Sequence, residues 1–199
     1  KLWFFAAGRD LERTRTETEK VRSINTFLED TLGSVEAASG TGEVTVRDLV
    51  EESALWIDIA LRDEPEVAAA IHSIVGNAYR NLDELDLAEQ HFESALALRR
   101  EIHGSSHVEI AQSLNQLALV QRARGNLEEA ERLFREGLAM RRATAGPGDL
   151  SVAYNLSNLS STVAAQGRLD EAEQLMRESL AIRLDLFGPR HQDVAMAHF

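Results

Sequence analysis

The sequence predicts an all-α fold, a right-handed superhelical solenoid built from antiparallel helix pairs. Sliding the chain 42 residues along itself brings its C-terminal two thirds into register, so that Gly104, Gly146 and Gly188 superpose. In the densest match, residues 125–141 and 167–183 are identical at 11 of 17 positions. A fixed period of about 20–50 residues is typical of solenoids, in which each unit buries its apolar face against its neighbours. The chain has three prolines and 44% hydrophobic residues, which favours long helices.

Composition limits what the chain can bind. Its net charge of −12 argues against nucleic acid, because a nucleic-acid-binding surface needs positive charge to displace counterions. The absence of cysteine excludes disulfides and thiolate metal sites. No feature of the sequence predicts a small-molecule cofactor.

Residues 1–33 are predicted to form an N-terminal helical element, with the helix itself from Asp10 to Leu32. Its second half carries an apolar stripe, formed by Val21, Ile24, Phe27, Leu28 and Leu32. Residues 1–7 are strongly apolar but far shorter than the roughly 20 residues that span a bilayer. Two interpretations of residues 1–7 stay open: the last turns of a membrane helix, or an apolar cap on the first helix.

Residues 34–44 are small and unpatterned, which predicts a flexible linker. A capping helix is expected over 45–62, because Thr45 with Asp48 three residues later resembles a capping box. Pro65 suits the first turn of the next helix. The capping helix is expected to present a broad apolar face, formed by Val46, Leu49, Val50, Ala54, Ile57, Ala60 and Leu61 and widened by Leu55, Trp56 and Ile59.

Residues 63–191 are predicted to form three helix pairs, at about 65–106, 107–148 and 149–190. In the middle pair, helix A runs from about Val108 to Arg124 and helix B begins near Leu127, with Gly125-Asn126 as the turn. Small residues are expected where the two helices touch, at Ala118, Ala130 and Gly137. Residues 192–199 match the start of helix A of a further pair.

The helix pairs resemble the tetratricopeptide repeat. The first pair carries His72-x2-Val75-Gly76-x2-Tyr79, then Ala88, Phe92 and Ala95, against the family pattern W-x2-L-G-x2-Y…A-x3-F. The later pairs match at Leu114, Leu117, Ala118, Gln121, Ala130, Phe134 and Gly137, and at Leu156, Leu159, Ser160, Val163, Ala172, Met176 and Ser179. The 42-residue length is similar to that of the kinesin light chain. The resemblance covers about residues 65–199 and implies a non-catalytic protein-interaction scaffold.

A second resemblance concerns the N-terminal third. Phe27-Leu28 with Leu32, and Val44-Thr45-Val46, resemble the segment that joins a membrane helix to tetratricopeptide repeats in some bacterial serine/threonine protein kinases. It implies the regulatory region of a membrane-bound kinase, and a membrane tether before Lys1. The chain itself has no Gly-rich phosphate loop, H-R-D or D-F-G motif. A purely structural assembly module is a third interpretation, and the location is cytoplasmic or, with the kinase layout, membrane-tethered.

No enzyme and no metal site are predicted. His103 and His107 are four residues apart, a spacing that on a helix can hold zinc, but Gly104-Ser105-Ser106 places them in a loop and no third ligand converges in the sequence. The acidic residues of helix B recur with the period and alternate with arginines, so a solvated face with i,i+3 and i,i+4 ion pairs is expected rather than a catalytic carboxylate pair.

The tetratricopeptide resemblance implies a concave groove that binds a peptide or partner protein, lined by the non-packing side of each helix A. The matching positions are Ser73, Asn77 and Arg80, then Gln112, Asn115 and Arg122, then Tyr154, Ser157 and Ser161. Arg80 and Arg122 are 42 residues apart and are expected to be exposed and to stack along the groove. Asparagine and arginine side chains can hold an extended peptide through its backbone amides and carboxylates.

Overall fold

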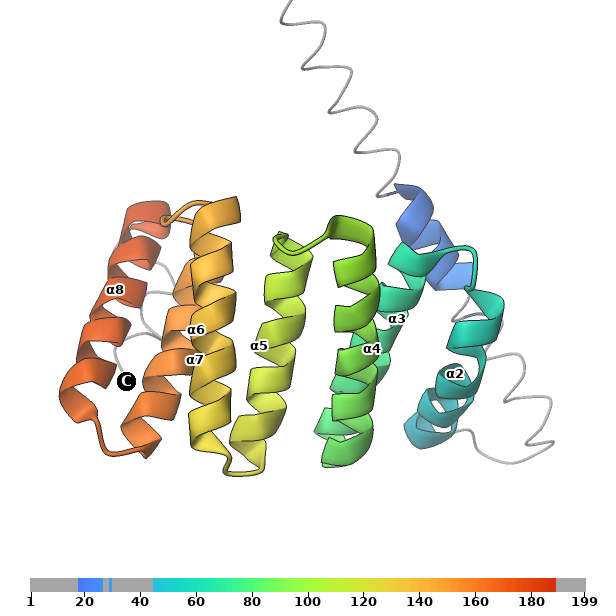
Figure 1. The fold of residues 1–199 in the computed structure, drawn as a ribbon, viewed down its shortest axis with the longest axis horizontal. Coiled ribbons are helices and arrows are strands. Elements are labelled where there is room, and N and C mark those ends of the chain that lie inside the picture. Colours follow the sequence, from blue (N-terminus) through green and yellow to red (C-terminus); the bar gives the residue numbers. More distant parts are fainter. Residues whose placement is uncertain (1–17, 27–28, 30–44, 189–199) are drawn as a thin grey trace, which may run out of the picture.

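The computed structural model describes residues 18–26, 29 and 45–188 (Figure 1). These ranges contain helices and no strand, so the predicted all-α repeat fold is confirmed. Residues 18–26 are helical and precede seven longer helices. The seven are α2 (Val46–Ala60), α3 (Pro65–Asn81), α4 (Leu85–His103), α5 (Val108–Ala123), α6 (Leu127–Thr144), α7 (Leu150–Ala165) and α8 (Leu169–Phe187). No helix in the described ranges has the length and apolar character needed to cross a membrane.

From α3 onward the helices form antiparallel pairs, α3 with α4, α5 with α6 and α7 with α8. Contacts are densest within each pair and next densest between successive pairs, where α4 meets α5 and α6 meets α7. Figure 1 shows the pairs side by side in one row, with α2 against α3 at one end. Each pair therefore buries its apolar residues largely on its immediate neighbours, which is the property of a solenoid.

The turns inside the pairs repeat with the sequence period. Gly125 has a φ of +81° and Gly167 a φ of +84°, and the equivalent residue of the first pair, Asp83, has a φ of +63°. Glycine takes this left-handed conformation without steric cost, and aspartate is one of the few other residues that adopt it as single residues. The turn geometry is thus kept even where the residue type changes.

The capping box at the start of α2 is confirmed. The Thr45 hydroxyl accepts a hydrogen bond from the Asp48 backbone N–H at 3.2 Å, and the Asp48 carboxylate accepts one from the Thr45 backbone N–H at 2.8 Å. The Thr45 hydroxyl also donates to the Asp48 carboxylate at 2.7 Å, and this hydrogen bond, followed by that from the Thr45 backbone N–H, lowers the pKa of the Asp48 carboxyl group. Two of the backbone groups that a helix start leaves unpaired are therefore satisfied locally.

The buried apolar face of α2 is narrower than the sequence predicts. Val50, Ile57 and Leu61 are buried. The residues expected to widen the face are exposed, with Leu55 at 70%, Trp56 at 46% and Ile59 at 64%. The reason is that α2 packs mainly on one helix, α3, and a single partner covers only one stripe of a helix surface.

Several predictions fall wholly or partly outside the described residues. The N-terminal helix is described only at residues 18–26 and 29. Residues 1–17, the linker at 34–44 and the final residues 192–199 lie outside the described ranges. The second resemblance rests on Phe27-Leu28 and Val44, which also lie outside them, so the kinase-linked interpretation stays a prediction.

Small residues allow the two helices of a pair to approach closely. Ala118 and Ala130 are fully buried between α5 and α6. In the first pair the contact is tighter, because a Cβ added at Gly76 would lie 2.6 Å from the ring of Phe92, which is also fully buried. A glycine is therefore required at residue 76 by packing, not by backbone conformation.

We expect Gly76→Ala to destabilise the protein. Overpacking of a core costs about 1–3 kcal/mol, whereas the helix propensity of alanine returns at most about 1 kcal/mol. The matched control is Gly148→Ala, because no described residue other than its chain neighbours lies within 4 Å of a Cβ added there. Urea unfolding measures both free energies. A Gly76→Ala protein as stable as the Gly148→Ala protein would show that the Phe92 ring moves aside freely.

Candidate functional site

The nine residues predicted to line a groove lie on α3, α5 and α7, and we call the surface that they form the helix-A surface. Gln112, Tyr154 and Ser161 are exposed, whereas Asn77, Arg80, Asn115, Arg122 and Ser157 are half-buried. Ser73 is buried, so its expected place on the surface is wrong. The Ser73 side chain lies where α3 contacts its neighbours, and its hydroxyl has no hydrogen-bond partner among the described residues. Eight of the nine residues thus remain within reach of a partner.

Asn158, which the sequence analysis missed, joins α5 to α7 on this surface. Its side-chain amide donates to the Asn115 side-chain oxygen at 3.4 Å, and its backbone carbonyl accepts from the Arg122 guanidinium at 3.4 Å. Both contacts are long for hydrogen bonds. They position Asn115 and Arg122 while leaving most of their donors available.

Arg80 and Arg122 lie close enough to repel each other. Burial lowers the pKa of Arg122, and the charge of Arg80 lowers it further. Both residues are half-buried, so their expected exposure is wrong. The Arg122 guanidinium lies 5.9 Å from the centre of the Phe134 ring, and the Arg80 Nε is buried with no hydrogen-bond partner in the part of the chain that the structure describes. Partial burial strengthens the interaction of this pair with an anion.

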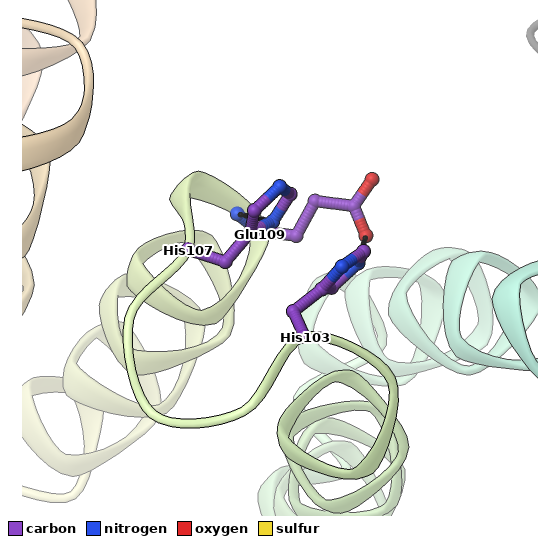
Figure 2. Close-up of side chains that lie close together, drawn as sticks. All are labelled: His103, His107 and Glu109. Carbon is purple, nitrogen blue, oxygen red and sulfur yellow. Dashed lines mark hydrogen bonds and ion pairs between the residues drawn. The ribbon is translucent and has the colours of Figure 1, made fainter.

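Two histidines and a glutamate meet where α4 passes into α5 (Figure 2). His103, His107 and Glu109 bring potential metal-ligand atoms within 4.8 Å of one another, so the expectation that no third ligand converges is wrong. The two imidazole rings stack with centroids 3.8 Å apart, and the Nδ1 of His107 accepts a hydrogen bond from the Glu109 backbone N–H as the cap of α5. Stacked rings direct their nitrogen lone pairs along parallel planes, which suits convergence on one ion poorly.

The Glu109 carboxylate already binds two cations. Lys20 Nζ lies 3.1 Å from one oxygen, and Arg99 Nε lies 3.5 Å from the other. Burial tends to raise the pKa of Glu109, but the hydrogen bond and charge of Lys20 and the charge of Arg99 lower it overall. These cations would repel a divalent metal. The cluster is better described as an ion-pair junction that ties the helical segment at residues 18–26 to α4 and α5.

A second histidine cluster links α2, α3 and α4. His72 Nε2 lies 3.3 Å from an Asp58 carboxylate oxygen, and His72 Nδ1 lies 2.9 Å from His91 Nδ1. The Tyr79 ring stacks on His91 with centroids 5.5 Å apart. Burial lowers the pKa of His91 to about 4, with a further contribution from the charge of His72, and burial also lowers the pKa of His72. From the sequence, His72 was identified only as a match to the repeat pattern, and this cluster was not predicted.

This cluster predicts a loss of stability on mild acidification. The unfolded histidines titrate near a pKa of about 6.5, above the folded value of about 4 for His91. The unfolded state therefore binds more protons at acid pH, and stability falls as the pH drops from about 6.5 towards 4. We expect wild type to lose about 1–2 kcal/mol more than His91→Gln between pH 7 and pH 5. Urea unfolding at both pH values measures the difference, and parallel losses in the two proteins would contradict it.

The acidic residues of helix B form ion pairs, as predicted. Arg132 pairs with Glu129 and with Glu136, at i,i+3 and i,i+4. Other pairs, which the sequence analysis did not anticipate, cross from one helix pair to the next, such as that of Arg135 with Glu171. These carboxylates are engaged by arginines on an exposed surface, so they do not form an isolated acid–base pair.

Comparisons with known proteins agree with this architecture. Family models for the tetratricopeptide repeat match residues 66–143 and 152–193, which together span more than half of the chain. Among curated proteins, none matches the chain. Solved structures with similar folds include the three that follow.

The structure of BtubC (BKLC) from P. vanneervenii has a TM-score of 0.68 and 21% identity, covering 89% of this chain and 68% of that one. A putative kinesin light chain from Podosopora anserina, with nearly identical TPR-like repeats, has a TM-score of 0.62 and 20% identity, covering 90% and 81%. The structure of MamA has a TM-score of 0.54 and 16% identity, covering 87% and 94%. At these identities the likeness concerns the fold.

Proposed function

This chain belongs to the tetratricopeptide repeat family, and from that membership we propose that its helix-A surface binds an acidic, extended segment of a partner protein. The chain is then a non-catalytic interaction scaffold whose ligand is a protein or peptide. Arrays of helix pairs offer extended surfaces that suit such ligands.

The main support for the proposal is the burial and the ion pairing of Arg80 and Arg122. Within the described residues neither forms an ion pair with a carboxylate, although the chain has 33 acidic residues against 21 basic ones. Arginines on the other side of the array, such as Arg135 and Arg142, are paired. Two half-buried guanidinium groups that repel each other are stabilised by an anion placed between them.

The neighbouring side chains suit an extended backbone. Asn115 is half-buried beside Arg122 and retains amide donors, while Gln112 and Ser161 are exposed on the same surface. Asparagine and glutamine can pair with the peptide groups of an extended ligand, while the arginines bind its carboxylates. The ligand chemistry is therefore one or two acidic side chains, or a terminal carboxylate, on an extended segment.

We expect the double variant Arg80→Gln/Arg122→Gln to bind such a partner roughly a hundredfold more weakly. Each lost charge-assisted hydrogen bond contributes about 1.5–3 kcal/mol, and about 1.4 kcal/mol corresponds to a tenfold change in affinity. Glutamine removes the charge without placing a carboxylate beside Phe134, so the helical circular dichroism spectrum should stay unchanged. Partners captured from a native lysate and identified by mass spectrometry supply the peptides, whose affinity is then measured by fluorescence polarisation.

The matched control is Arg142→Gln/Arg177→Gln, which removes the same charge from α6 and α8. Both residues lie on exposed parts of helix B, where they pair with Glu178 and Glu173. The control should change the affinity less than twofold. Equal weakening by the two double variants would mean that binding depends on overall charge or on the helix-B side, and the helix-A surface would lose its role.

A further inference from the structure

A cleft of about 340 Å³ opens between α4 and α6, on the side of the array away from the helix-A surface. Figure 1 looks onto this side and shows α5 behind the space between α4 and α6. The cleft has an apolar floor, formed by Leu96, Leu114, Leu117 and Leu133. Its rim is charged and includes Glu93, Glu129 and Glu136, with Arg100 and Arg132. The volume is at the lower end of the range of about 300–1,000 Å³ found for ligand sites.

The next junction along the array, between α6 and α8, brings equivalent positions of the repeat together, but the charges at these positions differ. There Arg135 on α6 pairs with Glu171 on α8 at 2.5 Å, and Arg142 pairs with Glu178 at 2.5 Å. A third pair, of Arg168 with Glu131, also crosses this junction. Arginines thus bridge the α6–α8 junction along its length.

The period of 42 residues identifies what the α4–α6 junction lacks. Glu93 occupies the position of Arg135, and Glu129 occupies the position of Glu171. Two carboxylates therefore stand where the next junction has an arginine and a carboxylate, and both line the cleft. Like charges cannot close this part of the junction, although Arg100 and Glu136, the equivalents of Arg142 and Glu178, still meet across it at 3.8 Å.

The charges at the rim are only partly balanced. Glu129 is held by Arg132 at 2.6 Å, and the same arginine also binds Glu136 at 3.1 Å. Arg100 reaches Glu136 at 3.8 Å. Glu93 is exposed and has no ion pair or hydrogen bond within the described residues. The rim therefore carries excess negative charge centred on Glu93.

We propose that this cleft binds an arginine side chain from a basic segment of a partner protein. The guanidinium group would lie between Glu93 and Glu129, as that of Arg135 lies against Glu171 in the next junction. The aliphatic stem of an arginine would cover the leucine floor, because long charged side chains bury their methylene groups on apolar surface. A guanidinium suits two facing carboxylates better than an ammonium, since its planar donors bind both at once. The site is separate from the helix-A surface and takes a ligand of opposite charge.

The test uses the full chain and a fluorescein-labelled peptide in which arginine alternates with alanine, with a citrulline version as the uncharged counterpart. Glu93→Arg places an arginine of the chain itself at the position equivalent to Arg135. This arginine should pair with Glu129 and close the cleft, and the free energy of unfolding should be equal or higher. The control is Glu101→Arg, which makes the same charge change at an exposed position of α4 outside the cleft. Fluorescence polarisation gives the affinities, and leucine methyl NMR locates the peptide.

We expect Glu93→Arg to weaken peptide binding at least tenfold and Glu101→Arg less than twofold. The citrulline peptide should bind the wild-type chain at least tenfold more weakly, and the arginine peptide should shift the methyl signals of Leu96 and Leu133. Equal weakening by the two variants would show diffuse attraction to an acidic protein and would overturn the proposal. A concentration-dependent dimer in sedimentation that Glu93→Arg abolishes would also overturn it, because the occupant would then be a second copy.

Discussion

Close packing within each helix pair requires small residues at the points where the two backbones approach. A Cβ added at Gly76 would lie 2.6 Å from the Phe92 ring, and in the second pair Ala118 and Ala130 have no exposed surface. This contact fixes how far each helix is rotated about its axis. The rotation decides which residues enter the junction with the next pair and which face a partner. The residues presented on the helix-A surface and in the α4–α6 cleft therefore depend on a few small residues inside the pairs.

A second periodic element is a series of arginines: Arg99 and Arg141 lie at junctions between pairs, whereas Arg183 contacts Ser157 and Tyr154 of its own pair. Arg99 is 4% exposed and donates to the Ser113 hydroxyl of the following helix at 2.6 Å, while Arg183 is 5% exposed. Burial lowers the pKa of Arg99 and of Arg141, and nearby carboxylates partly offset this effect. Buried arginines contribute less to stability than to specificity, because desolvation offsets much of their attraction to their partners. Arg99 and Arg141 interact with the next pair and help to fix its register, which in turn aligns the surface residues that recur every 42 positions.

Sequence analysis predicted the helix pairs, the turn at Gly125 and the capping box at Thr45, because each is encoded by the period or by residues three or four apart. Properties that depend on packing partners were not predicted: Trp56 is exposed because α2 has one main neighbour, and Ser73 is buried because α3 has several. Glu109 joins the two histidines with Lys20, which lies 89 residues away and has no sequence signal. The acid pair of Glu93 and Glu129 was predictable in principle, since the alignment that reveals the period also aligns Glu93 with Arg135.

The residue at one repeated position, Glu93 on α4 and Arg135 on α6, decides whether that part of a junction is bridged by an ion pair or left open. The most direct measurement is leucine methyl NMR of the double variant Glu93→Arg/Arg135→Glu, titrated with the arginine–alanine peptide. This exchange keeps the net charge and moves the facing carboxylates from the α4–α6 junction to the α6–α8 junction. We expect the peptide-induced shifts to move from Leu96 and Leu133 to their equivalents, Leu138 and Leu175. Shifts that stay at Leu96 and Leu133, or that occur at neither junction, would contradict it.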